Sequence, residues 1–215
     1  MPYKAIIFDL DGTLLDTLED IADSMNLALG ENGLPEHPLD AYRYFVGSGV
    51  KVLAELSVGK GSTPELVQKV LEGYLWHYAR LSKNKTRPYD GVTDAAKALH
   101  YKGLKLAVLS NKPHLSTLEV VAEYFPDLPF TAVYGQREGV PHKPDPGATL
   151  AIAREMGIDP ADFLYAGDTA VDMATASGAG MYAVGVLWGF RYIEELVESG
   201  ARVIISRPDE LPKLV

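Results

Sequence analysis

Cysteine is absent from this chain of 215 residues. Disulfide bonds, thiolate nucleophiles and cysteine-bound zinc are therefore excluded. Long apolar runs are absent as well. No stretch approaches the ~18 to 20 apolar residues of a membrane span, and the opening MPYKAIIFDLDG holds too short a run for a signal peptide. We therefore expect a soluble cytoplasmic protein that does not enter a membrane.

Positively charged residues are also fewer than negatively charged ones. The chain has 20 Lys and Arg against 29 Asp and Glu, which gives a formal net charge of -9. This balance argues against binding to nucleic-acid backbones or anionic membranes. A phosphorylated ligand would therefore need a local cationic group or a metal ion. Apolar residues, at 47%, suffice for a core, and the length suggests one main domain with a smaller appendage.

Six short apolar runs stand out along the chain. They lie at residues 5–8, 104–109, 130–134, 163–166, 182–187 and 203–206. Their apolar character is nearly continuous, which is typical of strands buried on both faces of a parallel sheet. Helical patterns separate the last five runs. The alternation predicts an α/β fold, with right-handed crossovers in a Rossmann-like open parallel sheet.

Residues 17–85 interrupt this alternation, because only helical patterns occur there. We interpret them as a small all-helical domain inserted into a core made of residues 1–16 and 86–215.

Three helix starts are predicted from local residue types. Ser62 with Glu65 forms a candidate capping box, Asp145 is a candidate N-cap, and a further helix would begin at Thr169.

The stretch AIIFDLDGT places Asp9 and Asp11 directly after the first apolar run. In an extended chain, residues two apart project to the same side, so both acids would point together past a strand end. A calcium loop of the EF-hand type would need glycine in place of Leu14 and glutamate in place of Asp20. Taken alone, the stretch also fits a plain Asp-Gly turn.

Polar residues follow other predicted strands as well. They are Ser110, Asn111 and Lys112, then Lys143 in a proline-bounded loop, then Asp168 with Asp172. Each has an ordinary explanation: a helix cap, a solvated lysine, or acids near a helix N-terminus. Open α/β sheets, however, bind ligands at the carboxyl ends of their strands. The joint pattern predicts one shared site at that edge.

These segments resemble a known family. DLDGT, SN, KP and GDTAVD match, in order, the four motifs of the haloacid dehalogenase superfamily. The helical insertion after DLDGT looks like the small helical cap domain of that superfamily. LAVLSNKP, YGQREGVPHKPDP and GVLWGFR further resemble the phosphoglycolate phosphatase-like branch.

The resemblance implies a Mg²⁺-dependent phosphatase. Asp9 would be the nucleophile that forms an aspartyl-phosphate. Asp11 would be the general acid and base, and its main-chain oxygen would join Asp9 and Asp168 as a metal ligand. Residue types agree with this chemistry, because a carboxylate can attack an anionic phosphate only where nearby positive charge offsets the repulsion. The expected substrate is a small phosphorylated metabolite, with 2-phosphoglycolate the leading candidate.

The resemblance assigns supporting roles to four further residues. Ser110, Lys143 and the backbone N–H of Asn111 would bind the phosphoryl oxygens. Asp172 would support the metal or Lys143 from behind.

Substrate choice is expected to depend on the helical insertion. In YRYFVGSGVK, Gly47 and Gly49 could let the backbone approach a ligand, and Arg43 and Lys51 are candidate anion contacts. A Gly-Ser-Gly link between helices and solvent-facing cations explain the same residues without a ligand.

Several alternative functions remain open. A haloacid dehalogenase would lack the second acid of the first motif, and Asp11 is present. A hexose-phosphate mutase or a pyrophosphatase of the same superfamily would keep all four motifs. A catalytically silent binding module would be expected to have lost Asp9, Asp11, Lys143 or Asp168. The chain is expected to be a monomer or a homodimer.

Overall fold

The computed structural model describes residues 3–215, which divide into two compact units. One unit combines the residues up to Leu15 with Pro88–Val215, and we call it the sheet unit. The other, Asp16–Arg87, is the helical unit. No helix in the described part of the chain combines the length and apolar character needed to cross a membrane.

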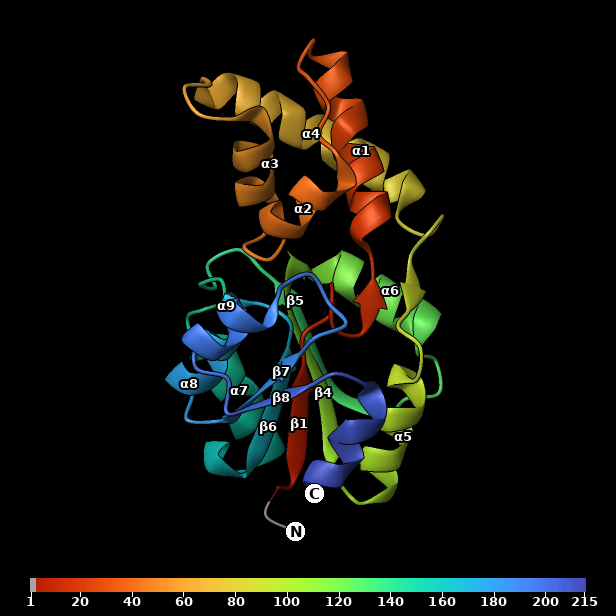
Figure 1. The fold of residues 1–215 in the computed structure, drawn as a ribbon, viewed down its shortest axis with the longest axis vertical. Coiled ribbons are helices and arrows are strands. Elements are labelled where there is room, and N and C mark those ends of the chain that lie inside the picture. The colour runs from red at the N-terminus through yellow and green to blue at the C-terminus, as the bar shows by residue number, and fades with distance from the viewer. Residues whose placement is uncertain (1–2) are drawn as a thin grey trace. The chain divides into compact units, whose positions relative to one another are not determined.

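The sheet unit contains six parallel strands within the described residues, in the order β5-β4-β1-β6-β7-β8 (Figure 1). The strands are β1 Ala5–Phe8, β4 Lys105–Pro113, β5 Phe130–Gln136, β6 Phe163–Gly167, β7 Tyr182–Val186 and β8 Val203–Ile205. Each contains or overlaps one of the six apolar runs, so the predicted Rossmann-like parallel sheet is confirmed. β4 ends at Pro113 and β5 at Gln136, beyond the ends of their runs.

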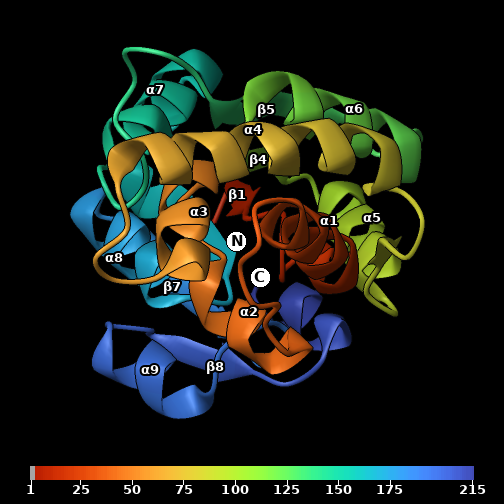
Figure 2. The same cartoon turned by 90° about the horizontal axis from the view of Figure 1, so that it is seen from above.

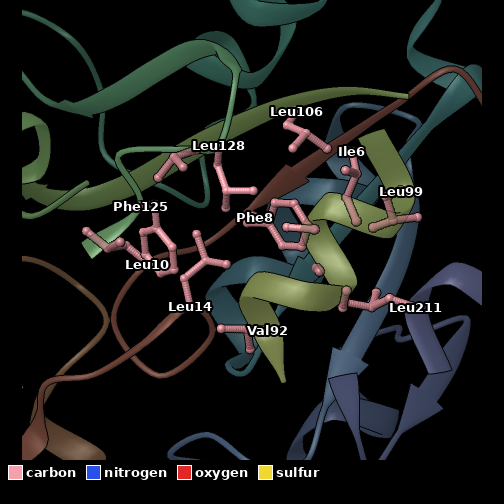
Figure 3. Close-up of a cluster of buried hydrophobic side chains, with 14 of the residues drawn as sticks. Ile6, Phe8, Leu10, Leu14, Val92, Leu99, Leu106, Phe125, Leu128 and Leu211 are labelled. Carbon is pink, nitrogen blue, oxygen red and sulfur yellow. The ribbon is translucent and has the colours of Figure 1, made fainter. Parts of the chain in front are cut away.

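Helices cover both faces of the sheet, and two apolar clusters lie between the layers. One cluster packs against α5 Val92–Tyr101 and α6 His114–Tyr124, and Figure 3 shows part of it. The other packs against α7 Gly147–Met156, α8 Ala170–Gly178 and α9 Ile193–Glu198. Successive side chains of a strand point to opposite faces, and β1 accordingly contributes to both clusters. Two short 3₁₀ segments, Pro160–Asp162 and Pro208–Leu214, complete the unit.

The helical unit consists of α1 Leu18–Glu31, α2 Leu39–Phe45, α3 Val50–Val58 and α4 Pro64–Leu81 (Figure 2). The helix α4 packs along α1 and α3.

Two short strands that the sequence did not predict lie where the chain passes between the units. They are β2 Leu15–Asp16 and β3 Arg87–Pro88, and they pair with each other. Runs of two residues are too short to give a periodic signal.

A buried aspartate ties the two ends of the helical unit together. Asp20, in the first turn of α1, is 1% exposed. Its carboxylate accepts hydrogen bonds from the backbone N–H of Lys85 at 3.0 Å and from the N–H and hydroxyl of Thr86, both at 2.8 Å. The beginning and the end of the unit are therefore held together by bonds within the unit itself.

Two of the three predicted helix starts need correction. The N-cap of α4 is Thr63, whose hydroxyl accepts from the N–H of Leu66, whereas Ser62 donates back to Gly59 O at 3.0 Å. The Ser62–Glu65 capping box is therefore wrong by one residue.

Asp145 is likewise one residue early, because α7 begins at Gly147 after Pro146. The Asp145 carboxylate still accepts from Gly147 N at 2.8 Å. Helix α8 begins directly after Thr169, in agreement with its predicted start.

Candidate active site

The candidate site lies at the carboxyl end of the central strand. β1 stands between β4 and β6, and the chain moves outward from β1 first on one side and then on the other. Such a switch point opens a crevice at the carboxyl ends of the strands. Asp9 directly follows β1, Ser110 lies in β4, and Asp168 directly follows β6. The topology therefore brings residues from three distant motifs to one edge.

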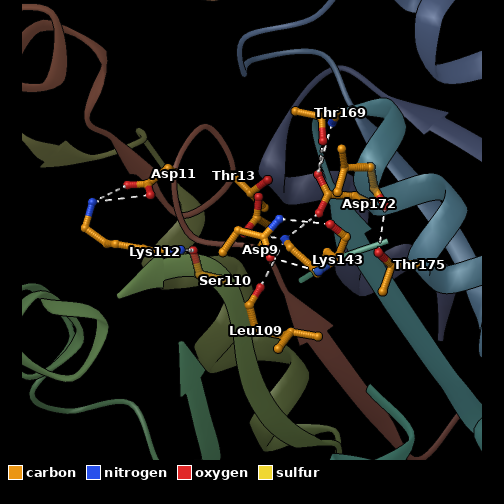
Figure 4. A network of polar contacts seen from close by, with 12 residues as sticks. Asp9, Asp11, Thr13, Leu109, Ser110, Lys112, Lys143, Thr169, Asp172 and Thr175 are labelled. Atoms are coloured by element: carbon orange, nitrogen blue, oxygen red, sulfur yellow. Dashed lines mark hydrogen bonds and ion pairs between the residues drawn. The ribbon is translucent and has the colours of Figure 1, made fainter. Parts of the chain in front are cut away.

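Three buried acids converge there. One carboxylate oxygen from each of Asp9, Asp168 and Asp172 lies within 4.8 Å of the others. Asp9 is 5% exposed, and the other two acids are fully buried. Lys143 Nζ lies 2.8 Å from Asp9 Oδ1 and 2.8 Å from Asp172 Oδ1 (Figure 4). When all three acids are ionised, one ammonium leaves two negative charges uncompensated within this group.

Burial and this excess of negative charge shift the pKa values of these groups. Burial raises the pKa of Asp9 well above its ordinary value, and the charge of Asp172 adds to the increase although Lys143 opposes it. Burial and Asp172 raise the pKa of Asp168 to about 7. Burial alone would lower the pKa of Lys143, but the charges of Asp172 and Asp9 raise it well above its ordinary value. The site therefore stabilises added positive charge.

The donor set fits a hard divalent cation. Carboxylate oxygens are the ligands that Mg²⁺ prefers. Asp9 Oδ1 is buried and accepts no hydrogen bond of normal geometry among the described residues, although Lys143 Nζ is close enough for an ion pair. Asp168 is oriented by Thr13 Oγ1 at 2.9 Å and by the N–H of Phe190 at 2.8 Å. An ion placed among these acids would complete the coordination of Asp9 and offset the excess negative charge.

Asp172 differs from Asp168 in one of its donors. Protein groups engage both oxygens of each acid, but Asp172 also accepts from the ammonium of Lys143. Oδ1 accepts from Lys143 Nζ, and Oδ2 accepts from the N–H and hydroxyl of Thr169 at 3.1 and 2.7 Å. This bonding suits a residue that holds Lys143 in place.

Asp11 does not point into this group of acids. Its carboxylate pairs with Lys112, whose Nζ lies 3.0 and 3.3 Å from the two oxygens (Figure 4). Both side chains are largely buried, at 4% exposure for Lys112 and 13% for Asp11. The expectation that an extended chain points Asp9 and Asp11 to the same side is therefore wrong. Instead, the chain turns, because Leu10 O accepts hydrogen bonds from the three N–H groups of residues 13–15.

Lys112 is the functional candidate that sequence reasoning missed. The sequence pattern places it after a strand and indicates no role for it. The signal available was its position beside Ser110, on a strand adjacent to β1. The side chain of Ser110 is itself buried and accepts from Lys112 N at 3.1 Å.

The remaining predicted residues fall in both units. Asn111 is buried in β4, and its side chain contacts the main chain of Lys143. In the helical unit, Arg43 lies half-buried in the last turn of α2, and Lys51 is exposed in α3. Gly47 lies in the connection between these helices, together with Gly49. A role of these four residues in substrate binding stays a prediction.

Comparison with known proteins agrees with this geometry. The chain matches the family model of haloacid dehalogenase-like hydrolases over residues 6–186. The phosphoglycolate phosphatase of Haemophilus influenzae (strain 86-028NP) is 33% identical over 204 residues, which cover 92% of this chain and 91% of that protein. The phosphoglycolate phosphatase of Mannheimia succiniciproducens is 31% identical over 220 residues, covering 99% and 98%. A solved structure from Lactobacillus delbrueckii subsp. bulgaricus, named as a proposed phosphoglycolate phosphatase, has a TM-score of 0.94 at 33% identity and covers 100% and 98%.

Proposed function

Because this chain belongs to the haloacid dehalogenase-like hydrolase family, we propose that it is a Mg²⁺-dependent phosphatase acting through an aspartyl-phosphate intermediate. The observation that carries the proposal is the buried group of Asp9, Asp168 and Asp172 with Lys143 at the switch point of the sheet. It offers a nucleophile, a cation site and a fixed positive charge within a few ångströms.

The metal would be held by the side chains of Asp9 and Asp168 and by the main-chain oxygen of Asp11. Mg²⁺, when bound, supplies positive charge that lets an anionic carboxylate approach an anionic phosphate. Asp172 would support the site indirectly by holding Lys143, whose ammonium also contacts Asp9.

The protein's own groups would carry the two half-reactions. In the first, an oxygen of Asp9 bonds to phosphorus while the bond from phosphorus to the leaving oxygen breaks, and Asp11 gives that oxygen its proton. In the second, water attacks phosphorus, Asp11 takes the proton from the water, and phosphate leaves Asp9. Lys143, Ser110 and the N–H of Asn111 bind the phosphoryl oxygens in both steps. Asp11 must exchange its contact with Lys112 for the leaving oxygen during turnover.

The proposed substrate is a small phosphorylated metabolite, and 2-phosphoglycolate is the leading candidate. The name shared by the curated relatives supports this choice. The helical unit is proposed to act as a cap domain that selects the substrate, with Arg43 and Lys51 as anion contacts and Gly47 allowing close backbone approach. Its insertion directly after the loop of Asp11 supports this role.

A phosphate-release screen tests the proposal. Purified protein with Mg²⁺ is offered 2-phosphoglycolate, sugar phosphates, nucleotides and pyrophosphate, and the ranking separates a phosphomonoesterase from a pyrophosphatase. A hexose-phosphate mutase would instead interconvert sugar phosphates without net release of phosphate. Asp9→Asn serves as the matched control, because it keeps the size of the side chain but removes the nucleophile. Undiminished Mg²⁺-dependent turnover in Asp9→Asn would rule out the assigned nucleophile.

A further inference from the structure

Lys143 is a buried residue in a largely exposed loop. The loop joins β5 to α7, and residues 141, 142, 144 and 145 on either side of Lys143 are exposed. Lys143 itself is 5% exposed. Its Nζ nevertheless meets Asp9 and Asp172 at 2.8 Å each. A lysine has a long side chain with several rotatable bonds. Its ammonium group can therefore hold a defined position only if the backbone of Lys143 is itself held in place.

The side chain of Asn111 makes hydrogen bonds with both the N–H and the carbonyl group of Lys143. Asn111 Oδ1 accepts from Lys143 N at 2.9 Å, and Asn111 Nδ2 donates to Lys143 O at 3.1 Å. Asn111 is 6% exposed and lies in β4, which pairs with β1. The two hydrogen bonds therefore connect the loop to the strand beside the one that carries Asp9.

We propose that Asn111 is a positioning residue, whose side chain fixes Lys143 at the distance from Asp9 that phosphoryl transfer requires. The inference rests on the proposed function. The backbone N–H of Asn111 is already proposed to bind phosphate, and the positioning role belongs to its amide side chain. The amide of asparagine supplies a donor and an acceptor on one planar group, whereas an ionised carboxylate of the same length supplies acceptors only. An aspartate here would keep the bond to Lys143 N but set an oxygen against Lys143 O. The two contacts with the main chain of Lys143 therefore favour asparagine over aspartate at position 111.

The test is a double-mutant cycle between Asn111 and Lys143. Wild type, Asn111→Ala, Lys143→Met and the double variant are assayed with p-nitrophenyl phosphate and Mg²⁺. Misplacing a catalytic group by about 1 Å costs roughly 10²-fold in rate, so we expect Asn111→Ala to lower kcat/KM by about 10 to 100-fold. In the Lys143→Met background, the same change should have less than about a twofold effect, because there is no ammonium left to position. Equal factors in both backgrounds would overturn the proposal.

Asn111→Asp and a surface control sharpen the result. Asn111→Asp should resemble Asn111→Ala, whereas Asn84→Asp, an exposed position in the helical unit, adds the same charge and should leave kcat/KM unchanged. Wild-type activity in both Asn111 variants would refute the positioning role.

Crystal structures separate this inference from the proposed function. In Asn111→Asp, Lys143 Nζ should leave its contacts with Asp9 and Asp172, and an unmoved ammonium would overturn the inference whatever the activity. A wild-type protein that hydrolyses no phosphate ester would refute the proposed function alone, since the position of Lys143 can still be compared.

Discussion

Gly12→Ala is the change whose consequences the structure defines most closely. Gly12 has a φ of +89°, and a Cβ built there would lie 2.7 Å from Asp168 Cγ and closer still to Oδ2. Ordinary contact begins at 3.4 Å, so the Asp168 carboxyl group would have to retreat by about 1 Å to clear its nearest atom, Oδ2. Asp168 also contacts Thr13 and Phe190 N, which limits where it can go.

Gly103→Ala provides a matched control. Gly103 has a φ of +94°, and nothing lies within 4 Å of its built Cβ. Both variants therefore incur the left-handed backbone cost, about 1 to 2 kcal/mol, but only Gly12→Ala disturbs Asp168. At this chain length, about 1 kcal/mol shifts the unfolding midpoint by roughly 2 to 4 °C. Gly103→Ala should thus melt a few degrees lower and keep its activity.

The assay measures kcat/KM for p-nitrophenyl phosphate and Mg²⁺ affinity by calorimetry. In Gly12→Ala, we expect kcat/KM to fall by about 10 to 100-fold and Mg²⁺ affinity to weaken, because a displacement approaching 1 Å has effects of that size. If Gly12→Ala matches Gly103→Ala within about threefold in both measurements, close packing against Asp168 is not what the site requires.

Three further predictions concern the acids and Lys112. Asp11→Ala should reduce turnover sharply yet keep more Mg²⁺ affinity than Asp168→Ala, because Asp11 would offer the metal only its main-chain oxygen; equal losses of affinity would contradict this division. The pKa of Asp168 is raised from its ordinary 3.8 to about 7, so its protonated form stabilises the fold and this contribution is lost as pH rises through about 7. Mg²⁺ should accordingly raise the unfolding midpoint more at pH 8 than at pH 5.5, and calorimetric scans that show equal gains would refute the charge argument. Lys112→Met removes the partner of Asp11 and should lower kcat/KM about tenfold for an alkyl phosphate, whose leaving group needs a proton, with less than about a twofold change for p-nitrophenyl phosphate. Similar losses on both substrates would show that Lys112 does not act through proton transfer.

The sheet and the gathering of motif residues could be predicted from sequence for a physical reason. Strands buried on both faces need nearly continuous apolar residues. Runs as short as AIIF and FLYA suit a strand better than a helix. Once those runs are strands of one parallel sheet, the residues after them must share an edge. The placement of Asp9, Ser110 and Asp168 therefore followed from topology without any knowledge of distances.

The details that were missed depend on contacts between distant parts of the chain. Asp11 and Lys112 are about a hundred residues apart, and no local pattern reveals that they pair. The turn after Leu10 replaces an extended segment because three N–H groups share one carbonyl, which periodicity does not record. The N-cap error at Ser62 arose because Ser62 and Thr63 are adjacent and chemically alike. In each case, a specific hydrogen bond or ion pair decided between structures that the residue types alone allow equally.

The carboxylate of Asp20 has a consequence for how such a chain can be assembled. Hydrogen bonds from Lys85 and Thr86 hold the two ends of the helical unit close together through contacts made within that unit. For the sheet, the whole excursion then costs little more loop-closure entropy than a short surface loop. We therefore expect that an insert that closes on itself in this way can be lengthened, shortened or replaced while the strands around it keep their register. The proposed cap domain could then vary while the residues at the strand ends stay the same.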